Sequence, residues 1–433
     1  MNGKIKLQYL RIFLYGGEEK MKEKSYMLAV PTAVGFDLDQ IHKRLQETKK
    51  FQLLDMNMKE DGILCFTIEY QNTTRLFEIY PAIFEIPLLY RSQHLFPDID
   101  LTKLEQVTEG LAVEMFFGEN ALMDYHLQLQ VIDVLLPDKL AVLDDSSEKI
   151  LSGKWVALAA ASNIPPAPRY LYTVQAVSSE EGSIWLHTHG LNRCGLSELE
   201  ILNSSKEMYQ THYTIIETMA NRMLELDHPL ALKEAFYLAQ LADDIHMVTT
   251  LVSWEEAVLH YDENMLGAKA DRENGHNGNT SAIFVYSSQE AYENKQYMPV
   301  MIYDEILKVN PVYYVSLSET NRMKTLAAER LSYLKYAVNH LKVPAMVKLG
   351  IPIDSEFGMN ENEEKEHIWF ELLEITDERI QAKLTQKPYF VSGLHKGDIG
   401  EYTLSHITDW FVIVSEKKIT PDDVYLFEIF TNN

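Results

Sequence analysis

A polar segment between residues 271 and 280 most constrains what this chain can fold into. It reads Asp-Arg-Glu-Asn-Gly-His-Asn-Gly-Asn-Thr, and it is rich in the residues that form turns. No other stretch of the sequence is as typical of a linker. The chain has 433 residues, which corresponds to two or three domains of about 150 residues each. We therefore predict an N-terminal domain at residues 21–268 and a C-terminal domain at residues 281–433.

Both predicted domains mix strand-like and helix-like patterns. Before the linker, strands are expected at 26–31, 62–70, 74–80, 140–144, 170–177, 183–189 and 199–202, the second and third forming a hairpin. Helices are expected there at 37–45, 101–117, 120–136 and 148–161, with two or three more within 206–262. After the linker, strands are expected at 282–286, 312–316, 343–349, 367–375, 380–384 and 410–414, with one long helix at 319–341. This mixture predicts an α+β fold of two mixed α/β domains with largely antiparallel sheets, the C-terminal domain being small and β-rich.

The charge of the chain restricts its partners. It has 39 basic and 64 acidic residues, a net charge of −25, which would repel a nucleic-acid backbone or an anionic membrane surface. No apolar run reaches the roughly 18 to 20 residues that a membrane-spanning helix needs. Residues 351–433 contain 17 acidic and 7 basic residues, so ten of the excess negative charges lie there. The leading hypothesis is a non-enzymatic acidic protein that binds a basic protein partner and needs no cofactor.

The cysteines and the N-terminal segment indicate a cytoplasmic protein. Only Cys65 and Cys194 are present, which provides no disulfide framework and fits a reducing compartment. The first 15 residues have a basic start and some apolar residues, but Arg11 interrupts the apolar run and no small-residue cleavage site follows. We expect translation to begin naturally at Met21.

Two parts of the sequence resemble families of unknown function. The run Trp185–Gly195, followed by Glu198–Ile201, resembles the bacterial family called domain of unknown function 4026. The patterns at His367–Glu371, Leu394–Asp398 and Ile407–Trp410 are similar to a second module, domain of unknown function 2314. The resemblance implies a cytosolic bacterial protein of mixed α/β architecture and implies no activity. Small acidic modules of this kind resemble those near bacterial toxin-immunity loci, which suggests an immunity-like role.

One constellation of polar residues lies inside the first of these motifs. If residues 192–195 form a turn, the flanking segments pair so that His189 lies opposite Glu198 and His187 opposite Glu200. Because side chains alternate along a strand, all four then point to one face. Thr188, Leu199 and Ile201 would occupy the other face.

Four interpretations of this constellation remain open. The four residues can form cross-strand hydrogen bonds on a half-exposed sheet, which is the commonest outcome for such side chains. They can instead bind one divalent metal ion, act as general acid and base, or contribute to a partner surface. The enzymatic alternative is accordingly a metal-dependent hydrolase that uses this His/Glu cluster. No common nucleotide-binding, esterase or metalloprotease motif accompanies it.

Three neighbouring features allow alternatives to this interpretation of the hairpin. Residues 197–200 also match a helix capping box, and a helix there would separate the histidines from the glutamates. Arg193 on the turn can contact an anionic ligand or simply be solvated. Cys194 beside it can have a lowered thiol pKa or be buried and inert.

The C-terminal motifs supply four secondary candidates. His395 and Asp398 lie in a Gly-Leu-His-Lys-Gly-Asp segment that can be a ligand loop but more often forms a tight turn between strands. Asp409 and Trp410 open an apolar strand, in which the tryptophan is expected to anchor the core and the aspartate to cap a turn. His395 and His406 lack a third ligand that would make metal binding plausible.

Overall fold

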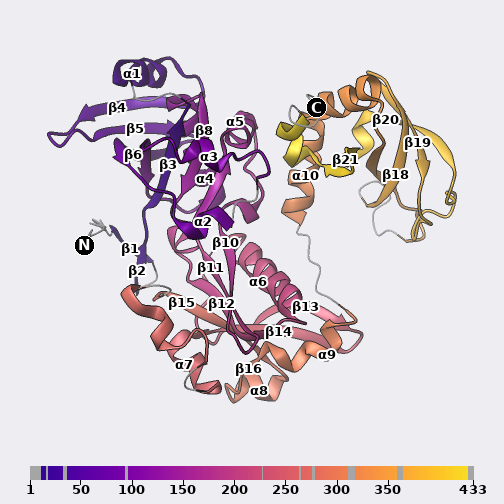
Figure 1. Ribbon diagram of the computed structural model, residues 1–433. Coiled ribbons are helices and arrows are strands. Elements are labelled where there is room, and N and C mark those ends of the chain that lie inside the picture. Colours follow the sequence, from indigo (N-terminus) through magenta and orange to yellow (C-terminus); the bar gives the residue numbers. More distant parts are fainter. Residues whose placement is uncertain are drawn as a thin grey trace. The chain divides into compact units, whose positions relative to one another are not determined.

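A computed structural model of the chain forms two compact units (Figure 1). Unit 1 comprises Met1–Ala160 and Ala167–Tyr314, and unit 2 comprises Ala161–Pro166 and Val315–Asn433. The structure describes residues 11–15, 18–32, 37–92, 96–226, 228–262, 265–275, 278–310, 317–357 and 364–427. The expected strand at 312–316 lies outside these ranges.

The first sheet of unit 1 has seven antiparallel strands in the order β4-β5-β6-β7-β3-β8-β9. Its strands are β3 (Ser25–Pro31), β4 (Gln52–Met58), β5 (Leu64–Tyr70), β6 (Thr73–Ile83), β7 (Glu109–Met115), β8 (Lys139–Asp144) and β9 (Lys149–Ser152). Its helices are α1 (Leu38–Glu47), α2 (Leu88–Ser92), α3 (Leu101–Leu104), α4 (Ala121–Leu135) and α5 (Gly153–Ala161). Residues of β3, β7 and β8 form a core with Tyr90 and Leu104 from α2 and α3. A short hairpin, β1 (Arg11–Tyr15) with β2 (Glu18–Lys22), precedes this sheet.

Two local patterns explain the helices around this sheet. Asp37 caps α1, because its carboxylate accepts hydrogen bonds from the backbone N–H groups of Asp39 and Gln40 at 3.0 and 3.1 Å. Helix α4 is buried on nearly all sides, with even Gln128 inside, and it packs against β7 and α1. The side-chain amide of Gln128 accepts a hydrogen bond from Oγ of Ser25 and donates one to the carbonyl of Val113.

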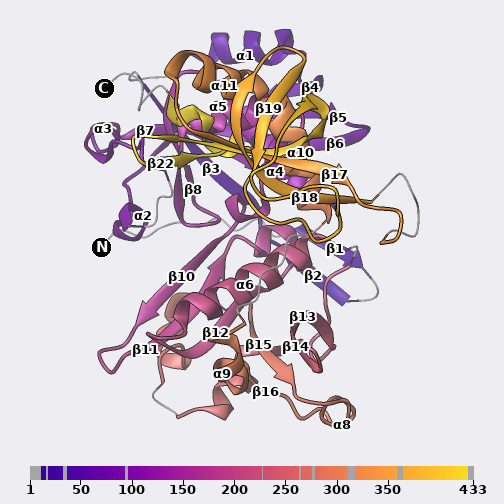
Figure 2. The same ribbon diagram turned by 90° about the vertical axis from the view of Figure 1, so that its right-hand side faces the viewer.

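The second sheet of unit 1 has the strand order β10-β11-β12-β15-β14-β13, with β16 beside β15. Its strands are β10 (Thr173–Ser178), β11 (Ser183–His189), β12 (Glu198–Ser205), β13 (Phe236–Ala242), β14 (Ile245–Ser253), β15 (Thr280–Tyr286) and β16 (Met298–Pro299). Only β12 and β15 pair in parallel among these strands. The associated helices are η1 (Pro168–Tyr170), η2 (Asn192–Cys194), α6 (Tyr209–Leu224), α7 (Trp254–Ala257), η3 (Val258–His260), η4 (Lys269–Gly275), α8 (Gln289–Glu293), η5 (Val300–Tyr303) and α9 (Asp304–Leu307). Helix α6 packs along β10, β11 and β12 (Figure 2).

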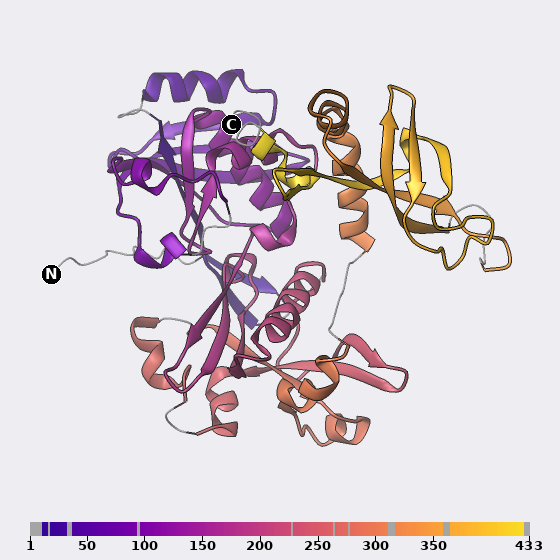
Figure 3. The same cartoon turned by 45° about the vertical axis from the view of Figure 1, so that its right-hand side comes forward.

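Unit 2 has a six-stranded antiparallel sheet in the order β20-β19-β18-β17-β21-β22 (yellow and orange in Figure 3). The strands are β17 (Ala345–Pro352), β18 (Lys365–Ile375), β19 (Arg379–Leu384), β20 (Ile399–Thr403), β21 (Ile407–Val414) and β22 (Lys417–Ile419). The helices are α10 (Leu317–Glu329), α11 (Leu331–Tyr336), η6 (Ala337–Leu341), η7 (Leu404–His406) and η8 (Pro421–Leu426). Strand β19 alternates strictly between exposed and buried side chains, because one face of this sheet is covered. The predicted α+β class is confirmed.

Two predicted helices are wrong. Residues 101–117 are helical only in α3, after which β7 forms the centre of the first sheet. Most of β7 is buried on both faces, so it lacks the alternation that would have indicated a strand. Of the two or three helices expected within 206–262, the part at 230–241 is wrong, because β13 pairs with β14 there. Register shifts within this hairpin leave Leu238 and Leu241 buried three residues apart, a spacing that imitates a helix.

The structure divides the chain later than the predicted boundary between residues 268 and 281. Strand β15 lies beyond that boundary, yet it pairs with β12 on one side and β14 on the other, and all seven of its residues are buried. Unit 1 therefore continues to Tyr314. Within the described ranges, no helix has the length and apolar character to cross a membrane.

Candidate functional site

The predicted hairpin is present in the second sheet of unit 1. Strands β11 and β12 are antiparallel, and His187 lies opposite Glu200, as the predicted register requires. The chain reverses through η2, which ends at Gly195 in the left-handed conformation with φ of 78°. The capping-box alternative is wrong, because Glu198 begins a strand rather than a helix.

Glu200 is fully buried in an ion pair. Its carboxylate accepts two hydrogen bonds from Nη2 of Arg272, at 2.8 and 2.9 Å, and one from Nε1 of Trp185 at 2.9 Å. The Arg272 guanidinium also lies over the rings of Trp185 and Trp254, at 5.1 and 4.4 Å from their centroids. Burial raises the pKa of Glu200, and the adjacent Arg272 opposes that rise. This carboxylate is therefore committed to an internal cation.

Arg272 is a residue of this site that sequence reasoning missed. It belongs to η4, inside the segment that was predicted to be a linker, and its Nε donates to the carbonyl of Gly267 at 2.9 Å. Gly267 has φ of 87°, and a Cβ there would lie 2.8 Å from Leu202. A solitary arginine in a polar, turn-rich segment carries no sequence signal for a buried partner 72 residues away.

Glu198 satisfies the backbone of the turn. Its carboxylate accepts hydrogen bonds from the N–H groups of Gly190 and Asn192, at 2.8 and 3.0 Å, and from Oγ1 of Thr188 at 2.7 Å. Simple alternation had placed Thr188 on the opposite face. Burial raises the pKa of Glu198 to about 7, while these three hydrogen bonds favour the ionised form. Glu198 thus holds the ends of the hairpin together.

His187 and His189 pack against each other, and each also contacts another side chain. The His187 ring packs on Trp185, with ring centroids 4.1 Å apart, and edge-on against His189 at 5.0 Å. Nε2 of His189 lies 3.8 Å from a carboxylate oxygen of Glu148. Among the described residues, no three or more His, Cys, Asp or Glu side chains are grouped so that they could hold a metal ion. The hairpin therefore brings His187 and His189 together without assembling the four predicted residues as a ligand set.

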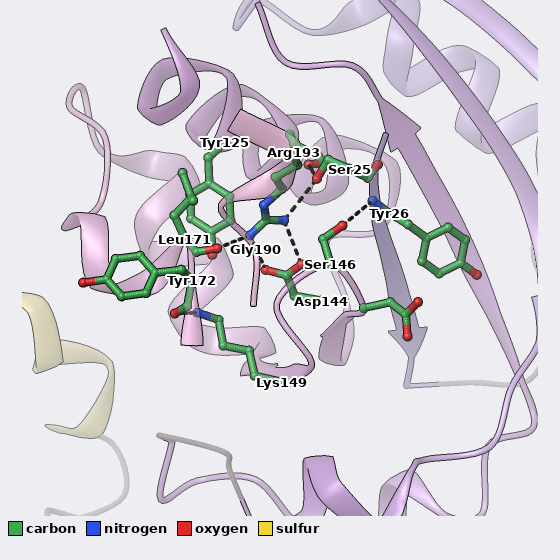
Figure 4. A network of polar contacts seen from close by, with 12 residues as sticks. Ser25, Tyr26, Tyr125, Asp144, Ser146, Lys149, Leu171, Tyr172, Gly190 and Arg193 are labelled. Carbon is green, nitrogen blue, oxygen red and sulfur yellow. Dashed lines mark hydrogen bonds and ion pairs between the residues drawn. The ribbon is translucent and has the colours of Figure 1, made fainter. Parts of the chain in front are cut away.

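Arg193 is buried, which corrects the expectation that it would be solvated (Figure 4). Its guanidinium forms a bidentate pair with Asp144, with N–O distances of 2.8 and 2.9 Å. It also donates to Oγ of Ser25 at 3.1 Å and to the carbonyl of Leu171. The ring of Tyr125 lies 5.2 Å from the guanidinium carbon. All these partners are internal, so the arrangement leaves this guanidinium committed to the fold.

The Arg193 network joins the two sheets of unit 1. Asp144 ends β8 and Ser25 begins β3, both in the first sheet, whereas Arg193 lies on the turn between β11 and β12. Nearby, Nζ of the buried Lys149 donates to the carbonyl of Tyr172 at 2.8 Å, and burial lowers its pKa to about 7 (Figure 4). Arg193 and Lys149 are thus both buried and bonded to internal acceptors at the boundary between the two sheets.

A backbone requirement fixes the same junction. Gly190 has φ of 116°, and a Cβ added there would lie 2.8 Å from the carbonyl oxygen of Leu171. That carbonyl is also a partner of Arg193. The chain can approach this closely only with glycine. The sequence Gly-Leu-Asn-Arg-Cys-Gly therefore has a packing explanation.

Cys194 has a raised rather than a lowered thiol pKa. Its sulfur contacts the carbonyl of Gly190 at 3.8 Å, and burial raises the pKa of the thiol to about 12. A lowered pKa would have required the neighbouring Arg193 to outweigh that burial, and it does not. The thiol pKa is raised rather than lowered, and the Cys194 side chain is half-buried.

The secondary candidates in unit 2 form local structure. The N–H of His395 donates to the Asp398 carboxylate at 2.7 Å, and the N–H of Asp398 donates to the carbonyl of His395 at 3.0 Å, which closes a tight turn before β20. Trp410 is fully buried and donates from Nε1 to the carbonyl of Ala327 in α10, at 3.0 Å. Asp409 lies within β21 rather than capping a turn, and burial raises its pKa to about 6.

A second hydrogen-bonded chain was not predicted. Oγ of Ser204 in β12 lies 2.7 Å from Nδ1 of His212 in α6, and Nε2 of His212 lies 3.0 Å from the Asp304 carboxylate at the start of α9. Serine, histidine and aspartate in series are the components of a nucleophile, its base and an orienting group. However, Ser204 is only 1% exposed and His212 is fully buried. The chain of hydrogen bonds therefore joins β12, α6 and α9 without an accessible nucleophile.

Comparisons with known families agree with the sequence resemblance. A model described as protein of unknown function (DUF4026), N-terminal, matches residues 25–166, and its C-terminal counterpart matches residues 174–284. A third model, uncharacterized protein conserved in bacteria (DUF2314), matches residues 327–425. No curated protein and no solved structure matches the chain. The two DUF4026 matches together cover more than half of the sequence.

Proposed function

The chain belongs to the DUF4026 family and carries a DUF2314 module at residues 327–425, and from this premise we propose that it is a non-enzymatic acidic protein that binds a basic protein partner. The proposal includes a cytoplasmic location and an immunity-like role, in which the partner is a basic protein such as a toxin.

The excess of negative charge carries this proposal. The chain has 64 acidic and 39 basic residues, so 25 carboxylates have no cation of the same chain to neutralise them. Burying an unpaired charge is costly, so the excess belongs on the surface. A surface of one sign speeds the encounter with a partner of the opposite sign and suppresses partners of the same sign.

The buried polar residues support a binding role over a catalytic one. Glu200 pairs with Arg272, Asp144 pairs with Arg193, and Glu198 accepts three internal hydrogen bonds. Each of these groups holds elements of unit 1 together. A binding function at the surface needs none of them exposed.

The metal-dependent hydrolase is the alternative, and elemental analysis of the purified protein tests it directly. Stoichiometric zinc, manganese or iron that disappears in a His187→Ala/His189→Ala variant would favour the hydrolase. Elemental analysis of a Glu198→Gln variant is a second test. If Glu198 is a metal ligand, the variant should lose metal, whereas a residue that only stabilises the turn should leave the metal content unchanged.

A capture experiment with the full chain tests the binding proposal. The tagged protein is incubated with a lysate of its native host, and an unrelated protein of similar net charge serves as the control bait. We expect a basic partner that the control does not capture, with an association rate that falls at least about tenfold when salt rises from 50 to 500 mM. Recovery of no specific partner, or of an acidic partner whose association is insensitive to salt, would contradict the proposal.

A further inference from the structure

Unit 2 exposes a group of aromatic side chains on ordered backbone. Tyr389 is 81% exposed, Phe390 is 47% exposed and Phe357 is 49% exposed. We call these three residues the aromatic platform. We infer that the aromatic platform is the surface on which unit 2 binds an arginine- or lysine-rich segment of a basic partner protein, an inference that rests on the proposed function.

The three rings form one cluster. The Phe357 and Phe390 rings meet edge to face, with centroids 5.7 Å apart, and Tyr389 lies beside Phe390 at 6.3 Å. A single exposed aromatic residue is ordinary on a protein surface, whereas adjacent ones form a patch. Large aromatic side chains are also the residues that most often contribute strongly to binding.

Two carboxylates fix the backbone that displays these rings. The Glu366 carboxylate of β18 accepts hydrogen bonds from the N–H groups of both Tyr389 and Phe390, each at 2.8 Å. The Asp354 carboxylate accepts from the N–H of Ser392 at 2.6 Å, and the N–H of Asp354 donates to the carbonyl of Phe390 at 2.9 Å. A loop held in this way loses little conformational entropy when a partner binds.

The carboxylates that hold the aromatic platform, and the short segments that carry it, favour a cationic partner. The N–H of Ile353 donates to the carbonyl of Glu364 at 3.2 Å, so the pairing of β17 with β18 continues beyond both strands. The described residues 353–357, 364–366 and 387–390 contain four acidic and two basic residues. They are Asp354, Glu356, Glu364, Glu366, Lys365 and Lys387. The hydrogen bond from Ser392 lowers the pKa of Asp354, which keeps that carboxylate ionised.

Aromatic faces and carboxylates together suit a guanidinium or ammonium group. A cation over the face of a tyrosine or phenylalanine gains about 0.5–1 kcal/mol at an exposed site, and more when water is excluded. A second copy of this chain would bring another net charge of −25 to the same surface, and an anionic membrane would be repelled equally. A basic protein segment is the occupant that satisfies both the rings and the charge.

Fluorescence polarisation with a defined peptide tests the inference on the full chain. The probe is a labelled peptide of alternating glycine and arginine, and the control probe replaces arginine with glutamate. We expect Tyr389→Ala/Phe390→Ala to weaken binding of the arginine peptide at least tenfold. Tyr336→Ala in α11, which removes another exposed tyrosine, should leave binding unchanged. Thermal unfolding of each variant should match the unsubstituted protein, because these side chains are exposed.

Hydroxyl-radical footprinting provides the second reading. Tyr389 and Phe390 should react readily in the protein alone and become protected when the arginine peptide is added. Protection already present in the protein alone would mean that the rest of the chain or a second copy covers the rings, and it would overturn the inference. Equal binding of both peptides, or no binding of either, would overturn it too.

The inference and the proposed function can fail separately. A basic partner captured equally well by the Tyr389→Ala/Phe390→Ala variant would place the contact elsewhere and leave the proposed function intact. Capture of no specific partner by the unsubstituted protein would remove the proposed function itself.

Discussion

Arg193 and Asp144 form a bidentate ion pair in which neither side chain is exposed, between the β11–β12 turn and the end of β8. Their hydrogen bonds are well formed, at 2.8 and 2.9 Å, and Ser25 and Leu171 accept further bonds from the same guanidinium. Such a pair contributes little over an apolar replacement of both partners, but removal of one partner leaves an uncompensated charge. This asymmetry makes the junction testable.

We predict that Arg193→Met destabilises the protein by about 3–5 kcal/mol, because the Asp144 carboxylate would remain buried without its cation. Urea unfolding at pH 7 measures the change in the free energy of unfolding. Arg379→Met is the matched control, since its ion pair with Glu401 is exposed and should contribute less than about 1 kcal/mol. Equal effects of the two substitutions would show that the Arg193 pair does not hold the junction.

Glu198 should make the stability of the protein decrease between pH 4.5 and pH 7. Its pKa in the folded state is about 7, above the ordinary value of 4.5, so its stabilising contribution is complete below pH 4.5 and is lost as the pH rises through 7. The loss for this single group is on the order of 3 kcal/mol. Glu198→Gln should remove that part of the pH dependence in urea titrations at a series of pH values. An unchanged slope in the variant would assign the pH dependence to other groups.

Lys149 should make the stability of the protein increase with pH between about pH 7 and pH 10. Its folded pKa is about 7, below the ordinary value of 10.5, so its stabilising contribution is complete above pH 10.5 and is lost as the pH falls through 7. The free energy of unfolding should therefore rise between pH 7 and pH 10, and Lys149→Met should flatten that rise. Lys383→Met, which alters an exposed lysine, should leave the rise intact. A rise that persists in Lys149→Met would refute the assignment.

The sequence allowed the hairpin to be predicted because its determinants are local. The register that places His187 opposite Glu200 follows from the position of the turn, and alternation along a strand follows from backbone geometry. The partners of these residues are not local. Arg272 reaches Glu200 across 72 residues, and Asp144 reaches Arg193 across 49. No pattern of spacing in one sequence encodes such pairs.

The same distinction separates the correct and incorrect parts of the predicted fold. Helix α1 was predicted because its apolar residues recur at helical spacing, and the β5–β6 hairpin because a turn of three residues separates two β-rich runs. Strand β7 and the β13–β14 hairpin were predicted as helices, because complete burial and register shifts respectively remove the period of two. The domain boundary differs because β15 pairs in parallel with β12, which lies about 80 residues earlier.

The Ser204–His212–Asp304 chain provides the last test, because it separates a structural role from a hydrolytic one. Asn203 has a left-handed backbone, with φ of 57°, and the following Ser204 contacts α6. With Ser204 only 1% exposed, we predict that a fluorophosphonate probe does not label the native protein. Ser204→Ala should lower the free energy of unfolding by about 1–3 kcal/mol, because the buried Nδ1 of His212 loses its partner.

Thr214→Ala in α6 is the matched control for Ser204→Ala, because its hydroxyl donates to the carbonyl of Gln210 in the same helix and its loss should change stability little. Mass spectrometry of the protein treated with the probe gives the decisive reading. Labelling of Ser204 that disappears in Asp304→Asn would show that the serine is accessible and activated by His212. In that case a hydrolase centred on this chain, rather than a binding protein alone, would explain the arrangement.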